Sequence, residues 1–216
     1  MDAKEIIARR VAQELHDRTL VNLGIGLPTL VARYVPEGML VAFQSENGII
    51  GFGARPPEGM EDPNLTDAGG GFISAMPGAF AFDSATSFAL IRGGHLDMTV
   101  LGGLQVDAKG RLANWMVPGR MVAGMGGAMD LVAGAKRVVI AMQHAAKGEA
   151  KIVPELTLPP TAARPVSLVV TDLAVIEPTP EGLLLRERAP GVAVAQILAA
   201  TTAPLILPDT IPEMRL

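Results

Sequence analysis

The feature that most constrains the fold is an alternation of short apolar runs with amphipathic helical stripes along most of the chain. Residues 19–26 and 40–45 are apolar runs that lead into glycines or an Asn-Gly pair, as buried strands often do. Residues 3–15 form a helical stripe, and Asp2 is placed to cap its start. This alternation predicts an α/β fold, an open and mainly parallel sheet with helices on both faces.

The same patterns predict the remaining elements. Further helices are expected at residues 28–34, 83–91 and 192–200, with a short helix opening near Gly124 and ending at about 133. Further strands are expected at 97–101, 137–142 and 167–171, and strand pairs at 104–107 with 111–115 and at 175–177 with 183–188. Glycine and proline dominate 51–78, which predicts mainly loop with short extended pieces.

The bulk composition indicates one globular unit. A length of 216 residues fits a single domain spanning 1–216, and 49% apolar with 19% charged residues is typical of a well-packed core. The mean hydropathy is positive, which leaves room for an apolar face covered by another subunit. We therefore expect self-association or a partner chain.

Several kinds of chemistry are excluded by what the sequence lacks. There is no cysteine, so disulfides, thiolate nucleophiles and cysteine-bound zinc are ruled out. His16, His95 and His144 share no metal-ligand spacing, so no metal site is expected. The sequence also lacks the glycine-rich phosphate loop of nucleotide hydrolases, the dinucleotide-binding fingerprint and the nucleophile elbow of serine hydrolases.

Charge and hydropathy also argue against nucleic acid and membrane partners. The formal net charge is −4, and no run of lysine and arginine offers a basic patch for nucleic acid. The longest uncharged stretch, 189–208, contains two prolines and is not expected to span a membrane. The N-terminus is charged from Asp2 onward and lacks an apolar signal segment, so a cytoplasmic location is expected.

The most informative local element is Ser45-Glu46-Asn47-Gly48, which places a carboxylate at a corner between a strand and a turn. Ligands of open α/β sheets gather at the carboxyl ends of strands, where Glu46 is predicted to lie. From the residues alone, a solvated glutamate in an ordinary turn remains an alternative. Gly24 and Gly26 likewise could be strand-exit glycines, and the glycines from Gly124 onward could serve close packing alone.

Seven ordered stretches resemble the B subunit, or C-terminal half, of family I CoA-transferases that act on 3-oxoacids. The stretches are Asn22-Leu-Gly-Ile-Gly-Leu-Pro28, Gln44-Ser-Glu-Asn-Gly-Ile-Ile-Gly51, Gly102-Gly-Leu-Gln-Val-Asp107, Asn114-Trp-Met-Val-Pro-Gly119, Gly124-Met-Gly-Gly-Ala-Met-Asp-Leu-Val132, Lys151-Ile-Val153 and Val170-Thr-Asp-Leu-Ala-Val-Ile176. They span almost the whole chain in order, so the resemblance is far more specific than the Ser-Glu-Asn-Gly element alone.

The resemblance implies roles for individual residues. It makes Glu46 the catalytic nucleophile, with an oxyanion site built from amides at Gly127 and Ala128. It also assigns CoA contacts, at Asn22, Gly24, Gly26, Asn47 and Gly48. Coenzyme A is then a substrate held as a covalent glutamyl-CoA thioester, and no tightly bound cofactor is implied.

The implied activity moves CoA between an acyl-CoA of the succinyl-CoA or acetyl-CoA type and a 3-oxoacid such as acetoacetate. The resemblance also implies an A-type partner in an A2B2 heterotetramer, or a B dimer when the chain is isolated. Without the A-type partner the isolated chain is expected to be inactive. Two alternatives remain at this stage: an enzyme like the sugar-phosphate isomerases, and a non-catalytic scaffold subunit of the same fold. The missing phosphate loop weighs against the first, and the intact Ser-Glu-Asn-Gly element weighs against the second.

Three positions depart from the family pattern. Gly70 and Gly71 stand where many relatives have a lysine associated with CoA, so that charge must come from elsewhere. Gln143 replaces a frequent glutamate before His144, and any tuning by that carboxylate is absent here. Leu156 replaces a frequent cysteine, which is interpreted as neutral core variation.

Overall fold

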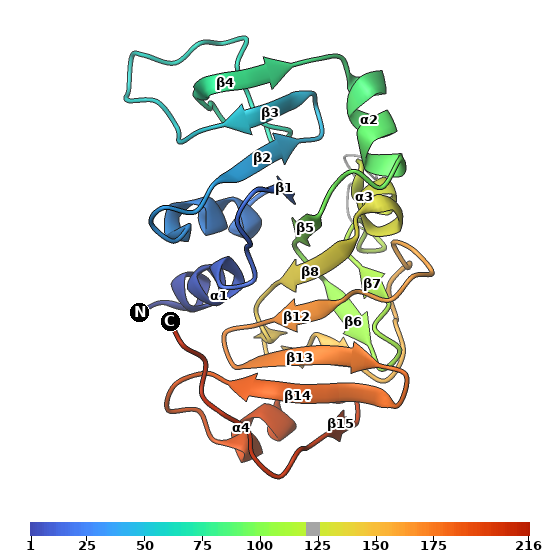
Figure 1. Ribbon diagram of the computed structural model, residues 1–216. Coiled ribbons are helices and arrows are strands. Elements are labelled where there is room, and N and C mark those ends of the chain that lie inside the picture. Colours follow the sequence, from blue (N-terminus) through green and yellow to red (C-terminus); the bar gives the residue numbers. More distant parts are fainter. Residues whose placement is uncertain (120–125) are drawn as a thin grey trace.

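A ten-stranded sheet forms the centre of the protein in a computed structural model that describes residues 1–119 and 126–216 (Figure 1). Five parallel strands lie in its middle, in the order β12 (Leu168–Val170), β8 (Arg137–Ala141), β5 (Met98–Leu101), β1 (Thr19–Leu23) and β2 (Val41–Ser45). Antiparallel strands extend both sides: β3 (Ile49–Phe52) and β4 (Ala75–Ala81) beyond β2, and β13 (Ala174–Thr179) and β14 (Gly182–Arg188) beyond β12. The short strand β15 (Leu205–Ile206) pairs with β14 in parallel and ends the sheet.

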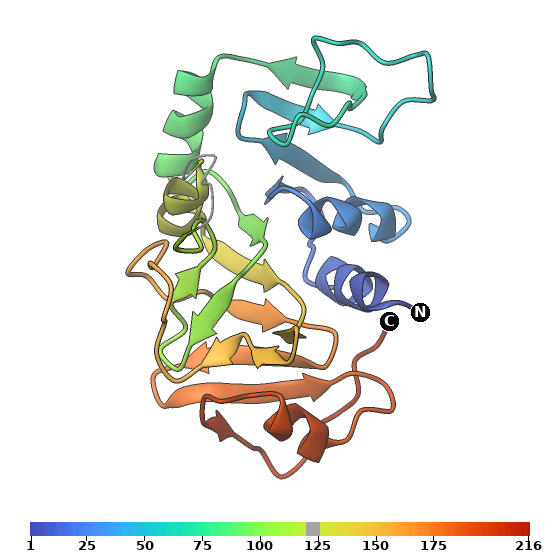
Figure 2. The ribbon, with the colours of Figure 1, turned by 180° about the vertical axis from the view of Figure 1, so that it is seen from behind.

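Helices cover both faces of the sheet, as the sequence predicts (Figures 1 and 2). One face carries α1 (Ala3–Ala12) and the 3-10 helix η1 (Leu27–Tyr34). The other carries α2 (Ser84–Arg92), α3 (Ala128–Gly134) and α4 (Val194–Ala199). A small sheet of β7 (Leu112–Ala113), β6 (Gln105–Asp107) and β11 (Ile152–Val153) packs there too, and β9 (Ala145–Ala146) pairs with β10 (Glu149–Ala150) nearby in the chain.

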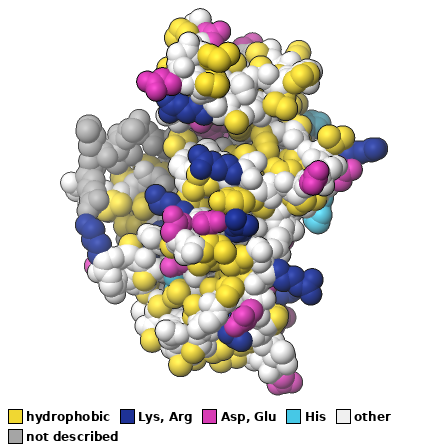
Figure 3. Space-filling model, turned by 90° about the vertical axis from the view of Figure 1, so that its left-hand side faces the viewer, with side chains coloured by type: hydrophobic (Ala, Val, Ile, Leu, Met, Phe, Trp, Pro, Cys, Tyr) yellow, Lys and Arg dark blue, Asp and Glu magenta, His cyan; other side chains and the backbone are white. Residues whose placement is uncertain are grey.

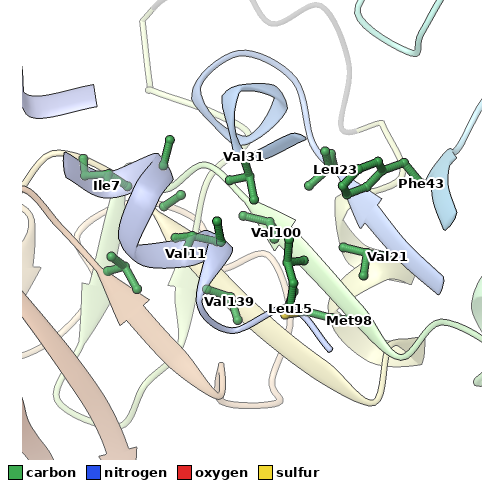
Figure 4. Close-up of a cluster of buried hydrophobic side chains, with 14 of the residues drawn as sticks. Ile7, Val11, Leu15, Val21, Leu23, Val31, Phe43, Met98, Val100 and Val139 are labelled. Carbon is green, nitrogen blue, oxygen red and sulfur yellow. The ribbon is translucent and has the colours of Figure 1, made fainter. Parts of the chain in front are cut away.

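The side chains of β8 show how one strand serves both cores. Val139 and Ala141 belong to the cluster under α1 and η1, whereas Val138 and Ile140 belong to the cluster under α2 and α3. This alternation is the period-two pattern of a strand buried on both faces. Figure 4 shows the first cluster, in which apolar side chains of the helices meet those of the sheet: Ile7, Val11, Leu15, Val21, Leu23, Val31, Phe43, Met98, Val100 and Val139.

Local signals account for most element boundaries. Asp2 caps α1, because its Oδ1 accepts the Glu5 amide at 2.7 Å, and Asp83 caps α2 through the Thr86 amide at 2.7 Å. The predicted strand pairs at 104–115 and 175–188 are present as antiparallel hairpins. The predicted loop 51–78 overlaps the end of β3 and the start of β4. Residues 53–74, between these strands, form the connection that the sequence predicts as loop.

The surface carries both charge signs. On the face shown in Figure 3, lysine and arginine side chains are scattered among aspartate and glutamate, with no broad basic area. Within the described residues, the helices are all too short or too polar to cross a bilayer.

Candidate active site

Glu46 lies in the tight turn between β2 and β3, at the carboxyl end of a central parallel strand, as predicted. The turn closes through the Gly48 amide, which donates to the Ser45 carbonyl at 3.0 Å. Gly48 has φ +122°, and a Cβ there would lie 2.0 Å from the Phe82 carbonyl oxygen. Only glycine fits both constraints, so Gly48 determines how the chain leaves Glu46.

A buried chain of polar side chains fixes the strand ends beside Glu46. Thr99 donates to Asn22 Oδ1 at 3.0 Å, Asn22 Nδ2 donates to Gln44 Oε1 at 2.7 Å, and Gln44 Nε2 donates to Ser87 Oγ at 2.8 Å. All four side chains belong to residues that are at most 2% exposed. A satisfied buried network of this kind rigidifies its surroundings, here linking β5, β1, β2 and α2.

The loop between β3 and β4 is tied to the same turn. Ser45 Oγ accepts the Ala68 amide at 2.9 Å, and Asn47 Nδ2 donates to the Thr66 carbonyl at 2.7 Å. Asn47 therefore directs its side chain at this loop. The contacts hold Ala68 at the edge of the cavity that Glu46 also lines.

The fold brings Gly127 to Glu46, although 81 positions separate them in the chain. The Gly127 amide donates to Glu46 Oε1 at 3.2 Å. A Cβ on Gly127 would lie 2.3 Å from Glu46 Oε2, so any larger residue would displace the carboxylate. Gly126 comes close as well, since a Cβ there would lie 3.7 Å from Oε1. Gly124, the first glycine of this cluster, lies outside the described residues.

Glu46 opens into a cavity of about 410 Å³ at the carboxyl ends of β1, β2 and β5. Its described lining residues come from both sides of the sheet edge: Asn22, Leu23, Gly24, Ile25, Glu46, Ala68, Leu101, Gly102, Gly103, Leu104, Asn114, Trp115, Gly126, Gly127, Ala128 and Leu131. No lysine, arginine or histidine is among these described residues. The described part of the cavity lining thus offers an apolar wall, backbone amides and the ionisable side chain of Glu46.

The predicted CoA contacts are only partly gathered at this cavity. Asn22 and Gly24 line it, but the Asn22 side chain is engaged in the buried network described above. Gly26, Asn47 and Gly48 are outside the lining, and Gly26 instead begins η1 with φ +83°. The sequence did not single out Gln44, Ser87 or Thr99, because their partners lie far away in the chain.

The environment of Glu46 disfavours its charged form. Partial burial raises the pKa of Glu46, the hydrogen bond from the Gly127 amide opposes this rise, and the negative charge of Asp130 adds to it. A carboxylate with a raised pKa in a cleft fits a reactive group better than a structural one.

Burial lowers the pKa of two further groups, Lys151 and His144. Lys151 Nζ donates to the carbonyl of Gly103, which lines the cavity, and burial lowers the pKa of this lysine. His144 is fully buried between Thr171 and Thr201, and burial lowers its pKa to about 4, so its ring is neutral at pH 7. Within the described residues, no three acidic or histidine side chains are arranged to hold a metal ion.

Comparison with known proteins shows which family this chain matches. The family model described as Coenzyme A transferase matches residues 4–200. The chain is 54% identical to the beta subunit of the acetate CoA-transferase of Haemophilus influenzae, covering 100% of this chain and 97% of that one. It is 50% identical to the B subunit of the succinyl-CoA:3-ketoacid coenzyme A transferase of Helicobacter pylori, covering 93% and 97%.

The fold agrees with this match. The structure resembles an acyl-CoA transferase apoenzyme from Escherichia coli O157:H7 with a TM-score of 0.77 and 22% identity, over 99% of this chain and 43% of that chain. Similarity at this identity shows the fold alone, whereas the family model and the relatives cover nearly the whole sequence. The chain therefore belongs to the coenzyme A transferase family.

Proposed function

We propose that this chain is the catalytic B-type subunit of a CoA-transferase, and that Glu46 carries CoA between two carboxylic acids. The observation that carries the proposal is the half-buried Glu46 carboxylate, which accepts the Gly127 amide inside a cavity at the carboxyl edge of the sheet. All 216 residues act as one unit in this proposal, and the enzyme works in the cytoplasm.

The reaction follows from the chemistry of a carboxylate nucleophile. Glu46 attacks the acyl-CoA carbonyl, the CoA thiolate leaves, and an acyl-glutamyl anhydride remains. The thiolate then attacks the Glu46 carbonyl carbon, which releases the first acid as its carboxylate and leaves a glutamyl-CoA thioester. The second acid reverses both steps. The carrier is itself a carboxylate, so the glutamyl-CoA thioester has a free energy near that of the acyl-CoA substrate and product.

The Gly127 amide supports the steps at the Glu46 carbonyl. When the thiolate adds to this carbon, negative charge develops on the oxygen that already faces the Gly127 amide. A donor held in place before the reaction stabilises that oxyanion without reorganisation, and losing one such donor typically costs about 3 kcal/mol of transition-state stabilisation. Ala128 lines the cavity next to it and is proposed as the second amide of this oxyanion site.

The substrate and partner proposals draw on the relatives. Their names pair acetate CoA-transferase or succinyl-CoA:3-ketoacid transferase activity with a beta or B subunit. For this chain we propose an A-type partner in an A2B2 heterotetramer, an acetyl-CoA or succinyl-CoA donor, and a 3-oxoacid such as acetoacetate as acceptor. A panel of acids that includes acetate and acetoacetate, assayed with the co-expressed subunits, distinguishes the acceptors.

The covalent step is testable by trapping. The complex is incubated with acyl-CoA, treated with borohydride, and mapped by peptide mass. Reduction of the Glu46 side chain to an alcohol is expected, because borohydride reduces a thioester but not a free carboxylate. The Glu46→Ala complex is the control, and it must show neither the reduced residue nor transfer. An unmodified Glu46 peptide in an active parent complex would contradict the mechanism and favour the non-catalytic alternative.

A further inference from the structure

Helices α2 and α3 lie side by side next to the candidate site (Figures 1 and 2). Arg92, in the last turn of α2, donates from Nε to Oδ1 of Asp130, in the first turn of α3, at 2.7 Å. The helices approach so closely that a Cβ on Gly134 would lie 2.1 Å from the Ile91 carbonyl oxygen. The ion pair thus joins two helices that are already in backbone contact.

Each of the two helices controls one half of the site. Helix α2 holds the strand that presents Glu46, because Ser87 accepts the Gln44 side chain, and Phe82, just before the helix, donates to the Gly48 carbonyl at 2.9 Å. Helix α3 begins directly after Gly127, whose amide contacts Glu46. The position of α2 relative to α3 therefore sets the position of the Glu46 carboxylate relative to the Gly127 amide.

Phe88 connects the ion pair to the site. Its ring lies against Gly127, where a Cβ would be 3.0 Å from Phe88 Cζ, and the Arg92 guanidinium lies over the same ring at 5.4 Å from its centroid. One arginine on α2 therefore contacts both Asp130 and the aromatic ring that packs beside the Gly127 amide. A substitution at Arg92 therefore changes the packing of the Phe88 ring, which lies beside the Gly127 amide.

Asp130 also acts on Glu46 by its charge. It is the only charged residue of α3, and its negative charge contributes to the raised pKa of Glu46. Asp67 and Asp83 lie on segments that contact the turn, and both accept backbone amides of their own segments. Arg92 pairs with Asp130 and so reduces the negative potential that Glu46 experiences.

We propose that Arg92 is a positioning residue for CoA transfer: through Asp130 it neutralises a carboxylate that Glu46 senses, and it holds α3 with the Gly127 amide in register with α2. The inference rests on the proposed function of Glu46 as the nucleophile. It differs from a purely structural role, because removal of the two partners has opposite effects on the ionisation of Glu46.

The test is the pH dependence of kcat/KM for the co-expressed complex, whose acid limb reports the ionisation of Glu46 in the free enzyme. In Arg92→Gln, Asp130 is left unscreened, and the acid limb is expected to move up by about half a pH unit. In Asp130→Asn the limb is expected to move down, because the Arg92 charge then acts alone. The double variant lacks both charges, so its limb is expected to lie between those of the two single variants. Carbodiimide labelling of Glu46, read by peptide mass against pH, follows the same ionisation without turnover.

Two controls isolate the effect. Arg92→Lys keeps the charge and is expected to restore the parent limb. Lys136→Gln breaks a pair with Asp97 of similar exposure, 63% and 34% for its side chains against 66% and 27% for Arg92 and Asp130, and is expected to leave the limb in place. If Arg92→Gln does not assemble, the test rests on Asp130→Asn, whose acid limb and Glu46 labelling curve are compared with those of the parent.

The inference is overturned if the limb and the labelling curve of Asp130→Asn coincide with those of the parent. It is also overturned if Arg92→Gln and Asp130→Asn shift them in the same direction. A failure of the proposed function looks different. In that case the Glu46→Gln complex retains transfer near the parent rate, while the labelling curves still show whether Arg92 and Asp130 act on the carboxyl group of Glu46.

Discussion

Two partly buried glutamates in different parts of the molecule show how neighbouring charges decide the use of a carboxylate. Glu14, beyond the end of α1, pairs with Arg10 at 2.6 Å and with Arg137, and its side chain is only 14% exposed. Arg10 is held in turn by both carboxylate oxygens of Glu187 at 2.7 Å. Glu46 has no such cation among its described partners and accepts one backbone amide.

The pKa of each glutamate reflects this difference. Burial acts to raise the pKa of Glu14, but hydrogen bonds and charge from Arg10 and Arg137 outweigh burial, and the pKa falls below its usual value. Burial acts in the same direction on Glu46, where the single Gly127 amide does not outweigh it and the pKa stays raised. A paired carboxylate stabilises the fold, whereas an unpaired carboxylate in a cavity keeps the reactivity that a nucleophile needs.

The largest expected effect separates the two glutamates by activity. Glu46→Gln should lower kcat of the complex by roughly 10⁴-fold or more, because the amide is a far weaker nucleophile and forms no anhydride. Its thermal midpoint should equal or exceed that of the parent at pH 7, because a group with a raised folded-state pKa is destabilising when charged. Glu14→Gln is the matched variant and should keep kcat per folded molecule. Loss of turnover in both variants would contradict the distinction between a catalytic Glu46 and a structural Glu14.

A smaller loss is expected from Gly127→Ala, which tests mainly the contact at Glu46, since Phe88 Cζ lies farther from the new Cβ at 3.0 Å. Gly127 has φ −85° and ψ 4°, which alanine accepts, so the main obstacle is the Glu46 carboxylate 2.3 Å from the new Cβ. Displacement of the carboxylate from its donor should reduce kcat about 10²-fold to 10³-fold. Steady-state kinetics with a melting curve checks this prediction. A parent-like kcat with an unchanged midpoint would show that Glu46 does not need the Gly127 amide.

Most of the fold could be predicted from local sequence patterns. The capped helix at Ala3–Ala12, the five central strands and the two hairpins carry periodicity, capping or turn signals that depend only on near neighbours. The strands that escaped prediction include β3 and β4, which lie at the ends of the predicted loop 51–78. Others are only two residues long, as at Ile152–Val153, whose parallel pairing with β6 joins residues about 46 positions apart. Such pairings form through tertiary contact, which a local pattern does not encode.

The site divides in the same way. Glu46 and Gly48 could be located because the end of a strand and a turn leave a signature in consecutive residues. The buried network of Asn22, Gln44 and Ser87 could not, because its members lie on three elements, and each alone reads as an ordinary polar residue. The cavity lining is likewise a product of the assembled sheet edge, so the sequence assigned no role in the site to Trp115 or Leu131, although both lie in stretches that resemble the family.

The smallest expected effect is on stability and concerns the paired glutamate. Glu14→Gln removes the carboxylate that Arg10 and Arg137 share, and it should lower the free energy of unfolding by about 2 kcal/mol at pH 7. The control is Glu5→Gln, which breaks an exposed pair with Arg9 and should change stability by no more than about 0.5 kcal/mol. Urea unfolding of the purified complexes measures both.

The pH dependence of that difference tests its cause. The folded-state pKa of Glu14 lies below its ordinary value of 4.5, so its stabilisation is complete above that pH and is lost as pH falls through the lower, folded-state value. The stability gap between parent and Glu14→Gln should therefore be constant from pH 7 to about 5 and close only in more acidic solution. The acid limb of transfer, set by the raised pKa of Glu46, should lie above 4.5. If the stability difference between parent and Glu14→Gln disappears at the same pH as the acid limb of transfer, the pKa values of Glu14 and Glu46 are not shifted in opposite directions.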